Sequence, residues 1–229
     1  MALLAVILWA SALGPLAAGH LYAMKRCPNP TPVESFDQSR VLGMWKVEWA
    51  VKTTSSCMEF EFKEEGDAFK VYEFKELSAS EKAGVEIKYG SVGTLTRTGT
   101  PGFYKASYST SKISGRFVIL DTDYESYLVV LHCMQLGPLG SRRTIYVLSK
   151  GGTPISSAVL DQVKGRLPNL GMRSEQLAQV SHENCVSRET ADIDLTGTVD
   201  TGDIVDAAKK VISLGGSVAK LFEVISMLG

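Results

Sequence analysis

The chain has 229 residues, of which 45% are hydrophobic, and a formal net charge of −1. This length is sufficient for one full-sized β-domain with a small appendage. The nearly neutral charge and the lack of a basic patch argue against a nucleic-acid-binding protein, which neutralises phosphates with clustered Lys and Arg.

Residues 1–19 are predicted to be a secretory signal peptide and not part of the fold. They carry no charged side chain, have an apolar centre and end in the small residues Ala17, Ala18 and Gly19. A membrane anchor is the alternative, but the run is short and no stop-transfer pattern follows. We therefore expect a secreted, extracellular protein. In that compartment the 4 cysteines are expected to form disulfides, with three connectivities open.

Period-two alternation predicts a series of antiparallel strands after the prolines at 28, 30 and 32. In residues 43–51, Trp45, Val47, Trp49 and Val51 share one face of the first strand. Further strands are predicted at residues 58–63, 68–77, 85–97, 103–110, 116–121, 124–134 and 142–150. In the strand 68–77 the apolar pair Phe69/Val71 is followed by Tyr72/Phe74, and this change of parity predicts a β-bulge.

Eight strands joined by short turns without intervening helices indicate an all-β antiparallel meander, which closes into a barrel or packs as a sandwich. Residues 156–167 then change to helical spacing, and Pro168 ends this predicted helix. A domain of residues 20–189 would contain both, followed by residues 190–229 as an acidic linker and an amphipathic helical tail.

Three short motifs lie in order along the predicted meander. They are Cys27-Pro28 with Phe36-Asp37 and Gly43-Met44-Trp45, then Asp121 to Tyr127 leading to Cys133, and finally Leu148-Ser149-Lys150. On these motifs the chain resembles the lipocalins, and among them the apolipoprotein D, insecticyanin and crustacyanin group. The resemblance covers about residues 27–185. It implies an eight-stranded up-and-down barrel with a flanking helix and the disulfides Cys27–Cys133 and Cys57–Cys185.

The chain departs from the family pattern at two positions. Lys46 replaces the aromatic residue that usually follows the tryptophan, and Lys150 replaces the arginine that lies over the ring in family structures. Lys150 is still expected to make a cation–π contact with Trp45, without the planar fork of arginine. The resemblance thus implies structural roles at the closed end of the barrel for Gly43, Trp45, Thr122, Asp123, Tyr124 and Lys150.

A barrel of this size holds one small ligand, such as a retinoid, bilin, carotenoid, steroid or fatty acid. The alternation predicts inward positions, the parity of four aromatic residues is ambiguous, and the resemblance adds Tyr146. The candidate ligand-binding residues are Val47, Trp49, Phe60, Phe62, Tyr72, Phe74, Ile87, Tyr89, Tyr108, Tyr127 and Tyr146. The alternative is that these side chains simply fill a core. The resemblance implies no required cofactor beyond a possible bound chromophore or lipid.

An enzyme is not expected. The 3 histidines, His20, His132 and His182, form no recognisable triad. If the implied disulfides form, no thiol remains as a nucleophile.

The residues after Cys185 are the second candidate for function. Residues 192–203 resemble a calcium loop with oxygen ligands at Asp192, Asp194, Thr196, Asp200 and Asp203. We favour the other interpretation, an acidic linker that caps the following helix. That helix is expected to pack on the barrel or to mediate peripheral membrane contact or self-association. A scaffold protein that acts through this tail is the alternative to a ligand carrier.

Overall fold

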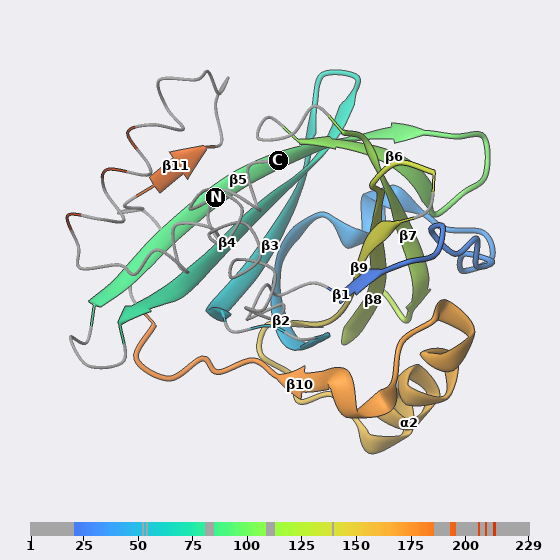
Figure 1. Cartoon of the computed structure of the whole chain (residues 1–229). Helices are drawn as coiled ribbons and strands as arrows, with labels where there is room; N and C mark the ends of the chain where they lie inside the picture. The colour runs from blue at the N-terminus through green and yellow to red at the C-terminus, as the bar shows by residue number, and fades with distance from the viewer. Residues whose placement is uncertain are drawn as a thin grey trace, which may run out of the picture.

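The computed structural model describes residues 21–51, 53, 55–80, 85–108, 113–138, 140–185, 193–195, 206, 209 and 213. The described chain forms one curved sheet, antiparallel except for one short strand, with a helix against its outer face (Figure 1). The strands are β1 (Leu21–Ala23), β2 (Gly43–Val51), β3 (Ser55–Glu65), β4 (Ala68–Ser80), β5 (Val85–Arg97), β6 (Phe103–Tyr108), β7 (Gly115–Thr122), β8 (Tyr127–Gln135), β9 (Ser141–Lys150), β10 (Leu177–Gln179) and β11 (Ile193–Leu195). The helices are η1 (Gln38–Val41), α2 (Ser157–Arg166), η2 (Pro168–Leu170) and η3 (Ser174–Gln176).

The sheet closes on itself. Each strand from β2 to β9 pairs antiparallel with the next along the chain, and β9 then pairs with β2, with Trp45 opposite Lys150. This makes a closed barrel of eight strands, so the predicted fold is confirmed. The short strands β1 and β10 lie beside β9 and β2.

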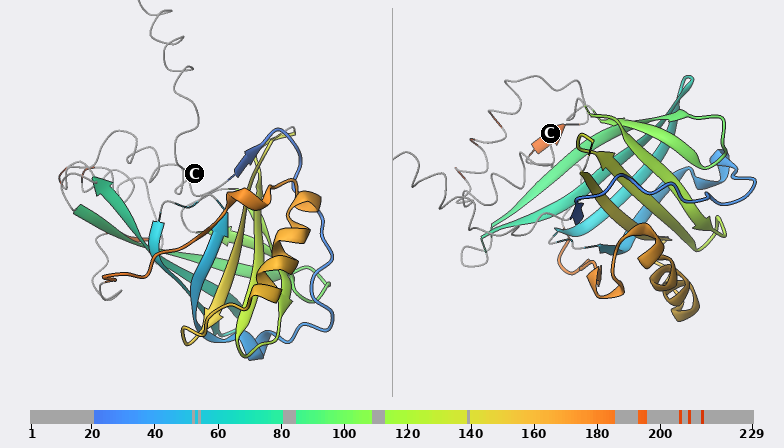
Figure 2. Two further views of the ribbon diagram at one scale, coloured as in Figure 1. Left: turned by 90° about the horizontal axis from the view of Figure 1, so that it is seen from below. Right: turned by 45° about the vertical axis from the view of Figure 1, so that its right-hand side comes forward.

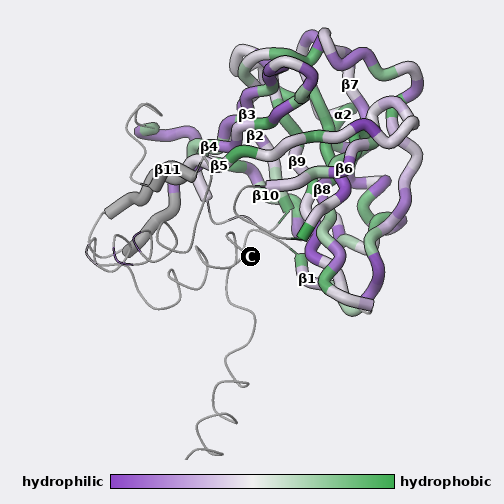
Figure 3. The backbone as a smooth tube through the Cα atoms, turned by 90° about the horizontal axis from the view of Figure 1, so that it is seen from above, coloured by the Kyte–Doolittle hydropathy of each residue, from purple (hydrophilic) through white to green (hydrophobic). Residues whose placement is uncertain are grey.

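Alternation along the strands sorts apolar side chains into two layers. The inner cluster fills the barrel and consists of Val41, Trp45, Val47, Ala50, Met58, Phe60, Phe62, Phe69, Val71, Leu95, Tyr104, Ala106, Phe117, Ile119, Leu128, Val130, Tyr146, Leu148 and Val180. The outer cluster consists of Val51, Val118, Leu120, Val129, Leu131, Ile145, Val147, Val163, Leu167, Leu170, Met172 and Leu177. Val163 and Leu167 belong to the outer cluster, so α2 and η2 pack against the outside of the barrel (Figure 2). The strands accordingly carry hydrophobic stretches while several loops are hydrophilic (Figure 3).

The barrel wall is uneven at the end that lies away from Trp45, which we call the far end. β4 and β5 have 13 residues each, whereas β6 has 6. Among the described residues, β6 pairs with β5 only as far as Gly93, opposite Tyr108. Beyond that point β11 pairs in parallel with β5, with Ile193 opposite Tyr89 (Figure 1). A segment of the predicted linker thus pairs with β5 where β6 no longer does.

Several predictions fall outside the described residues, among them the signal peptide and most of the C-terminal helix. Asp206, Lys209 and Ser213 are helical, and Lys209 Nζ lies 2.8 Å from Asp206 Oδ1. In the described part of the chain, no helix is both long and apolar enough to cross a membrane.

Candidate functional site

One end of the barrel is plugged by Trp45. Its ring is fully buried, and its Nε1 donates a 2.8 Å hydrogen bond to the carbonyl of Val41 at the end of η1. Lys150 Nζ lies 5.2 Å from the ring centroid, within the range of a cation–π contact. Gly43, at the start of β2, has a φ of +98°, a conformation that side-chain-bearing residues rarely adopt. These residues form a stopper built from β2, β9 and η1.

The turn at residues 122–124 is held by its own side chains. Thr122 Oγ1 accepts a 2.8 Å hydrogen bond from the backbone of Tyr124 and donates one of 2.6 Å to the carbonyl of Tyr127. The carboxylate of Asp123 accepts from the three backbone N–H groups of residues 125–127 and from Ser126 Oγ. Burial raises the pKa of Asp123, but these hydrogen bonds outweigh it and lower the pKa to about 2.

Tyr124 joins this turn to the segment that precedes β2. Its hydroxyl accepts a 3.0 Å hydrogen bond from the backbone of Asp37, and its ring stacks on Phe36 with centroids 6.0 Å apart. The guanidinium of Arg40 lies 4.1 Å from the same ring. The motifs around Phe36, Trp45 and Tyr124, which are far apart in the sequence, therefore meet at the plugged end.

Five of the candidate ligand-binding residues face the barrel interior. Val47, Phe60, Phe62 and Tyr146 belong to the inner cluster, and Tyr108 packs against it. Phe60 lies edge-on to Tyr146 with ring centroids 4.8 Å apart, and to Phe62 at 6.4 Å. Burial raises the pKa of Tyr146 far above its ordinary value, so its hydroxyl stays protonated. The interior between the plug and the far end is therefore aromatic and largely apolar.

Trp49 does not face the interior, and that prediction is wrong. The register between β2 and β9 shifts between Val47, which is opposite Leu148, and Trp49, which is opposite Val147. This β-bulge reverses the parity of the strand, so Trp49 packs against the outer cluster while Ala50 joins the inner one.

Tyr72 and Phe74 also lie on the outer side, contrary to prediction. The pairing of β4 with β3 runs without a shift from Phe74 to Ala68, so the predicted bulge is absent. The hydroxyl of Tyr72 donates to Glu65, and Lys63 Nζ lies 5.0 Å from its ring, both at the exposed end of the β3–β4 hairpin. Phe74, two residues on, shares the outward parity of Tyr72.

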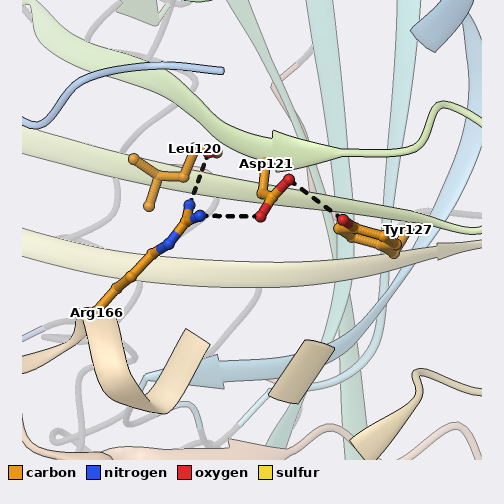
Figure 4. Close-up of polar contacts among 4 residues, drawn as sticks. All are labelled: Leu120, Asp121, Tyr127 and Arg166. Atoms are coloured by element: carbon orange, nitrogen blue, oxygen red, sulfur yellow. Dashed lines mark hydrogen bonds and ion pairs between the residues drawn. The ribbon is translucent and has the colours of Figure 1, made fainter. Parts of the chain in front are cut away.

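Tyr127 is the last candidate placed outside. It packs against the outer cluster, and its hydroxyl donates a 3.2 Å hydrogen bond to Asp121. Arg166, at the end of α2, lies 3.1 Å from the same carboxylate and donates a 2.9 Å hydrogen bond to the carbonyl of Leu120 (Figure 4). This group fastens α2 to the wall and has no access to the interior. The side chains of Ile87 and Tyr89 lie outside the described set, although their backbones belong to β5.

A group of polar side chains lies on the inner face toward the far end, and sequence reasoning found only Tyr108 among them. We call them the polar band: Glu73, Lys75, Tyr108, His132, Arg142 and Thr144. The hydroxyl of Tyr108 donates a 2.6 Å hydrogen bond to Glu73, and its ring centroid lies 5.1 Å from that of His132. Glu73, Lys75, His132 and Arg142 are each 9% exposed or less. Glu73 and Lys75 could have been found from the regular alternation that continues along β4 from Phe69 and Val71. The bulge that the sequence analysis predicted after Val71 turned both residues outward instead.

Burial governs the charges in the polar band. It raises the pKa of Glu73, although the charge of Lys75, the hydrogen bond from Tyr108 and the charge of Arg142 each act to lower that pKa. Burial and then the neighbouring Arg142 and Lys75 lower the pKa of His132 to about 3, so its ring is neutral near pH 7. Among the residues that the structure describes, His132 Nε2 has no hydrogen-bond partner. A buried ring nitrogen without a partner is costly, and it is a place where a bound molecule can donate or accept a hydrogen bond.

The disulfides are Cys27–Cys133 and Cys57–Cys185, the pairing that the family resemblance implied. The first ties the N-terminal segment to β8, and the second ties the chain after β10 to β3. Of the five predicted calcium ligands only Asp194 is described, and its backbone pairs with Gly90 in β5. Within the described residues no group of acidic, histidine or cysteine side chains is suited to hold a metal ion.

Comparison with solved structures places this barrel among known ones. The chain is similar to insecticyanin from the tobacco hornworm Manduca sexta, with a TM-score of 0.57 and 20% identity, over 78% of this chain and 98% of that one. It is also similar to apocrustacyanin C2, with a TM-score of 0.51 and 14% identity, over 74% of this chain and 96% of that one. No family model matches the chain.

Proposed function

We propose that this chain, whose fold is that of the lipocalins, is a secreted protein that binds and carries a small hydrophobic molecule inside its barrel. The observation that carries the proposal is the asymmetry of the interior. One end is plugged by Trp45, the middle is lined by rings such as Phe60 and Tyr146, and the buried charged side chains that the structure describes on the inner face lie toward the far end. A filled scaffold gains nothing from buried charges at one end, whereas a container for an apolar molecule needs a closed end and an entrance.

The chemical class of the ligand follows from the lining. Aromatic and aliphatic side chains favour an elongated apolar body, so a retinoid, bilin, carotenoid, steroid or fatty acid is the proposed class. Binding without catalysis is proposed because both disulfides together use all 4 cysteines and leave no thiolate nucleophile. The two disulfides also support export into an oxidising compartment.

The proposal is tested by extraction and by fluorescence. Mass spectrometry of an organic-solvent extract of the secreted protein should find a hydrophobic molecule in stoichiometric amount. In parallel, W49F leaves Trp45 as the one tryptophan after residue 20. Its emission should be quenched saturably by retinol, biliverdin or palmitic acid.

A matched pair of variants locates the binding. Ala106 is fully buried in the inner cluster, whereas Ala178 is exposed on β10. A106F should weaken binding, because it fills the interior, while A178F should leave binding unchanged. If A106F lacks the wild-type circular dichroism spectrum, V130F replaces it, since Val130 also faces inward. An extract without a hydrophobic molecule, together with no saturable quenching by any of the three probes, would refute the proposal.

A further inference from the structure

Two buried polar side chains lie side by side on neighbouring strands inside the barrel, and we call them the inner polar pair. His132 on β8 is directly opposite Thr144 on β9, and the next pair along the ladder, Val130 and Tyr146, belongs to the inner cluster. Because side chains alternate along a strand, the inner polar pair also points inward, and directly opposite residues place their Cβ atoms about 5 Å apart. His132 is 6% exposed and Thr144 is 1% exposed. The pair therefore lies where the aromatic lining gives way to the polar band.

The hydrogen-bonding atoms of this pair are not satisfied by the described part of the chain. His132 Nε2 and Thr144 Oγ1 are both buried there without a hydrogen-bond partner. Burial raises the pKa of Tyr146 and Thr144 acts to lower it, so the two hydroxyls lie near each other, but not in the geometry of a hydrogen bond. A buried donor or acceptor that is left unsatisfied loses its hydration without compensation. Two such atoms on opposite residues of one ladder can be satisfied together by a single bound oxygen.

The ring of His132 is positioned by its neighbours on β7. Its centroid lies 6.2 Å from that of Phe117, which is directly opposite on β7. A Cβ at Gly115 would meet His132 Nε2 at 2.8 Å, so the glycine leaves room for the imidazole on the inner face. The ring centroid of Phe117 lies 6.1 Å from that of Phe62. The aromatic lining thus runs from Phe62 up to the inner polar pair without a break.

We infer that the barrel selects hydrophobic ligands that carry a neutral oxygen, a hydroxyl or a carbonyl, with His132 Nε2 and Thr144 Oγ1 hydrogen-bonded to that oxygen and the apolar body lying toward Phe62. The inference rests on the proposed function and adds the chemistry of one group of the ligand. Among the proposed classes it favours the alcohols and ketones of retinoids, carotenoids or steroids.

The chemistry of the inner polar pair matches a neutral oxygen. The hydroxyl of Thr144 can donate or accept, and the neutral imidazole of His132 has one donor and one acceptor nitrogen. A ligand hydroxyl also donates and accepts, so it satisfies both groups in either tautomer of His132. A ligand carbonyl accepts from both when Nε2 carries the proton. Neither group brings a charge, and a neutral oxygen brings none that would need compensation in the buried interior.

The test compares ligands that share one body and differ only in the oxygen. Retinol is compared with axerophthene, its deoxy analogue, and hexadecanol with hexadecane, by the change in Trp45 fluorescence of the W49F protein at pH 7.5. The hydrocarbon leaves both polar atoms unsatisfied, whereas the alcohol pairs with them. We therefore expect each alcohol to bind about tenfold more tightly than its hydrocarbon.

Variants of the inner polar pair locate the preference. T144V removes one hydroxyl at nearly constant volume and H132F removes the ring nitrogens, so each should reduce the alcohol-to-hydrocarbon ratio severalfold without weakening the binding of the hydrocarbon. H132Q, which can still hydrogen-bond to the oxygen, should keep more of the ratio than H132F. Thr96 is exposed on β5, so T96V makes the same chemical change outside the interior and should leave the ratio unchanged. Far-UV circular dichroism confirms that each variant is folded, and T144V and H132F each test the inference without the other.

The outcomes separate the two proposals. Alcohols and hydrocarbons that bind equally well overturn the inference and leave the proposed function standing. A preference for alcohols that T144V and H132F leave unchanged also overturns it, because the oxygen would then be bound elsewhere. If neither alcohol binds while palmitic acid or biliverdin does, the inference is again overturned and the proposed function stands. If none of these molecules binds, the inference fails, and a solvent extract without a hydrophobic molecule would then refute the proposed function as well.

Discussion

The unusual environment of His132 makes the stability of the protein depend on pH in a way that can be calculated. Burial holds the pKa of this histidine at about 3, against an ordinary value of 6.5. Because the pKa is lower in the folded state, the unfolded chain takes up the proton first as the pH falls. The stabilisation is therefore complete above pH 6.5 and is lost progressively as the pH decreases toward 3.

The magnitude follows from linkage. At pH 5 the unfolded imidazole is almost fully protonated while the folded one is neutral, which lowers the free energy of unfolding by about 2 kcal/mol relative to pH 8. In H132Q this loss should disappear. Glu73 titrates in the opposite direction, since burial raises its pKa. It is present in both proteins, so its effect cancels in the difference between them.

The assay is urea denaturation of delipidated wild type and H132Q at pH 8 and pH 5, with the disulfides intact and tryptophan fluorescence as the signal. H182Q is the control, because His182 is only half-buried, with its Nε2 3.0 Å from the carbonyl of Val47. The wild type and H182Q should lose about 2 kcal/mol more than H132Q between the two pH values. Parallel losses in the wild type and H132Q would refute the placement of a neutral, buried His132 inside the barrel.

Three further predictions concern the disulfide, the turn and the plug. The disulfide Cys57–Cys185 spans 128 residues, so C57A/C185A should lower the free energy of unfolding in urea by about 5 kcal/mol, and a loss below about 1 kcal/mol would contradict the chain-entropy account. The pKa of Asp123 is lowered to about 2 from an ordinary 3.8, so its ionised carboxylate stabilises the fold above pH 3.8, and this stabilisation is lost as the pH falls toward 2. D123N should therefore have a lower free energy of unfolding at pH 6 and a shallower acid transition by circular dichroism. At the plug, K150M should destabilise by about 0.5–1 kcal/mol in thermal unfolding through the lost contact with Trp45, whereas K150R should not; equal loss in both would argue against a cation–π role.

Much of this architecture could be predicted because the strands obey a simple rule over long runs. Phe60 and Phe62 on β3 alternate without interruption, and the structure places both inside. The motifs around Gly43, Asp121 and Lys150 identified the plugged end, since each of these segments has a local reason for its shape. Gly43 has a positive φ, and the carboxylate of Asp123 accepts three backbone N–H groups.

The wrong predictions lie on three strands, and those on β2 and β4 come from a misjudged parity of the strand. On β2 a bulge after Val47 turns Trp49 outward, and nothing in an alternation of apolar residues marks the position of an extra residue. On β4 the opposite happened: the strand is regular, but its inward face changes from Val71 to Glu73, so polarity was mistaken for a change of direction. The rule that apolar residues face inward therefore fails at Glu73 and Lys75, where the strand buries polar side chains in spite of the cost.

That failure is informative about function. A fold that only needed a packed interior would continue the apolar series of β4 beyond Val71, because each buried charge requires compensation. The chain instead places Lys75 opposite the plugged end and brings Arg142 and His132 to it from two other strands. Natural sequences depart from local consistency mainly at functional sites. Glu73 and Lys75, which the predicted bulge on β4 turned outward, therefore lie at the end of the barrel where we expect the ligand to enter.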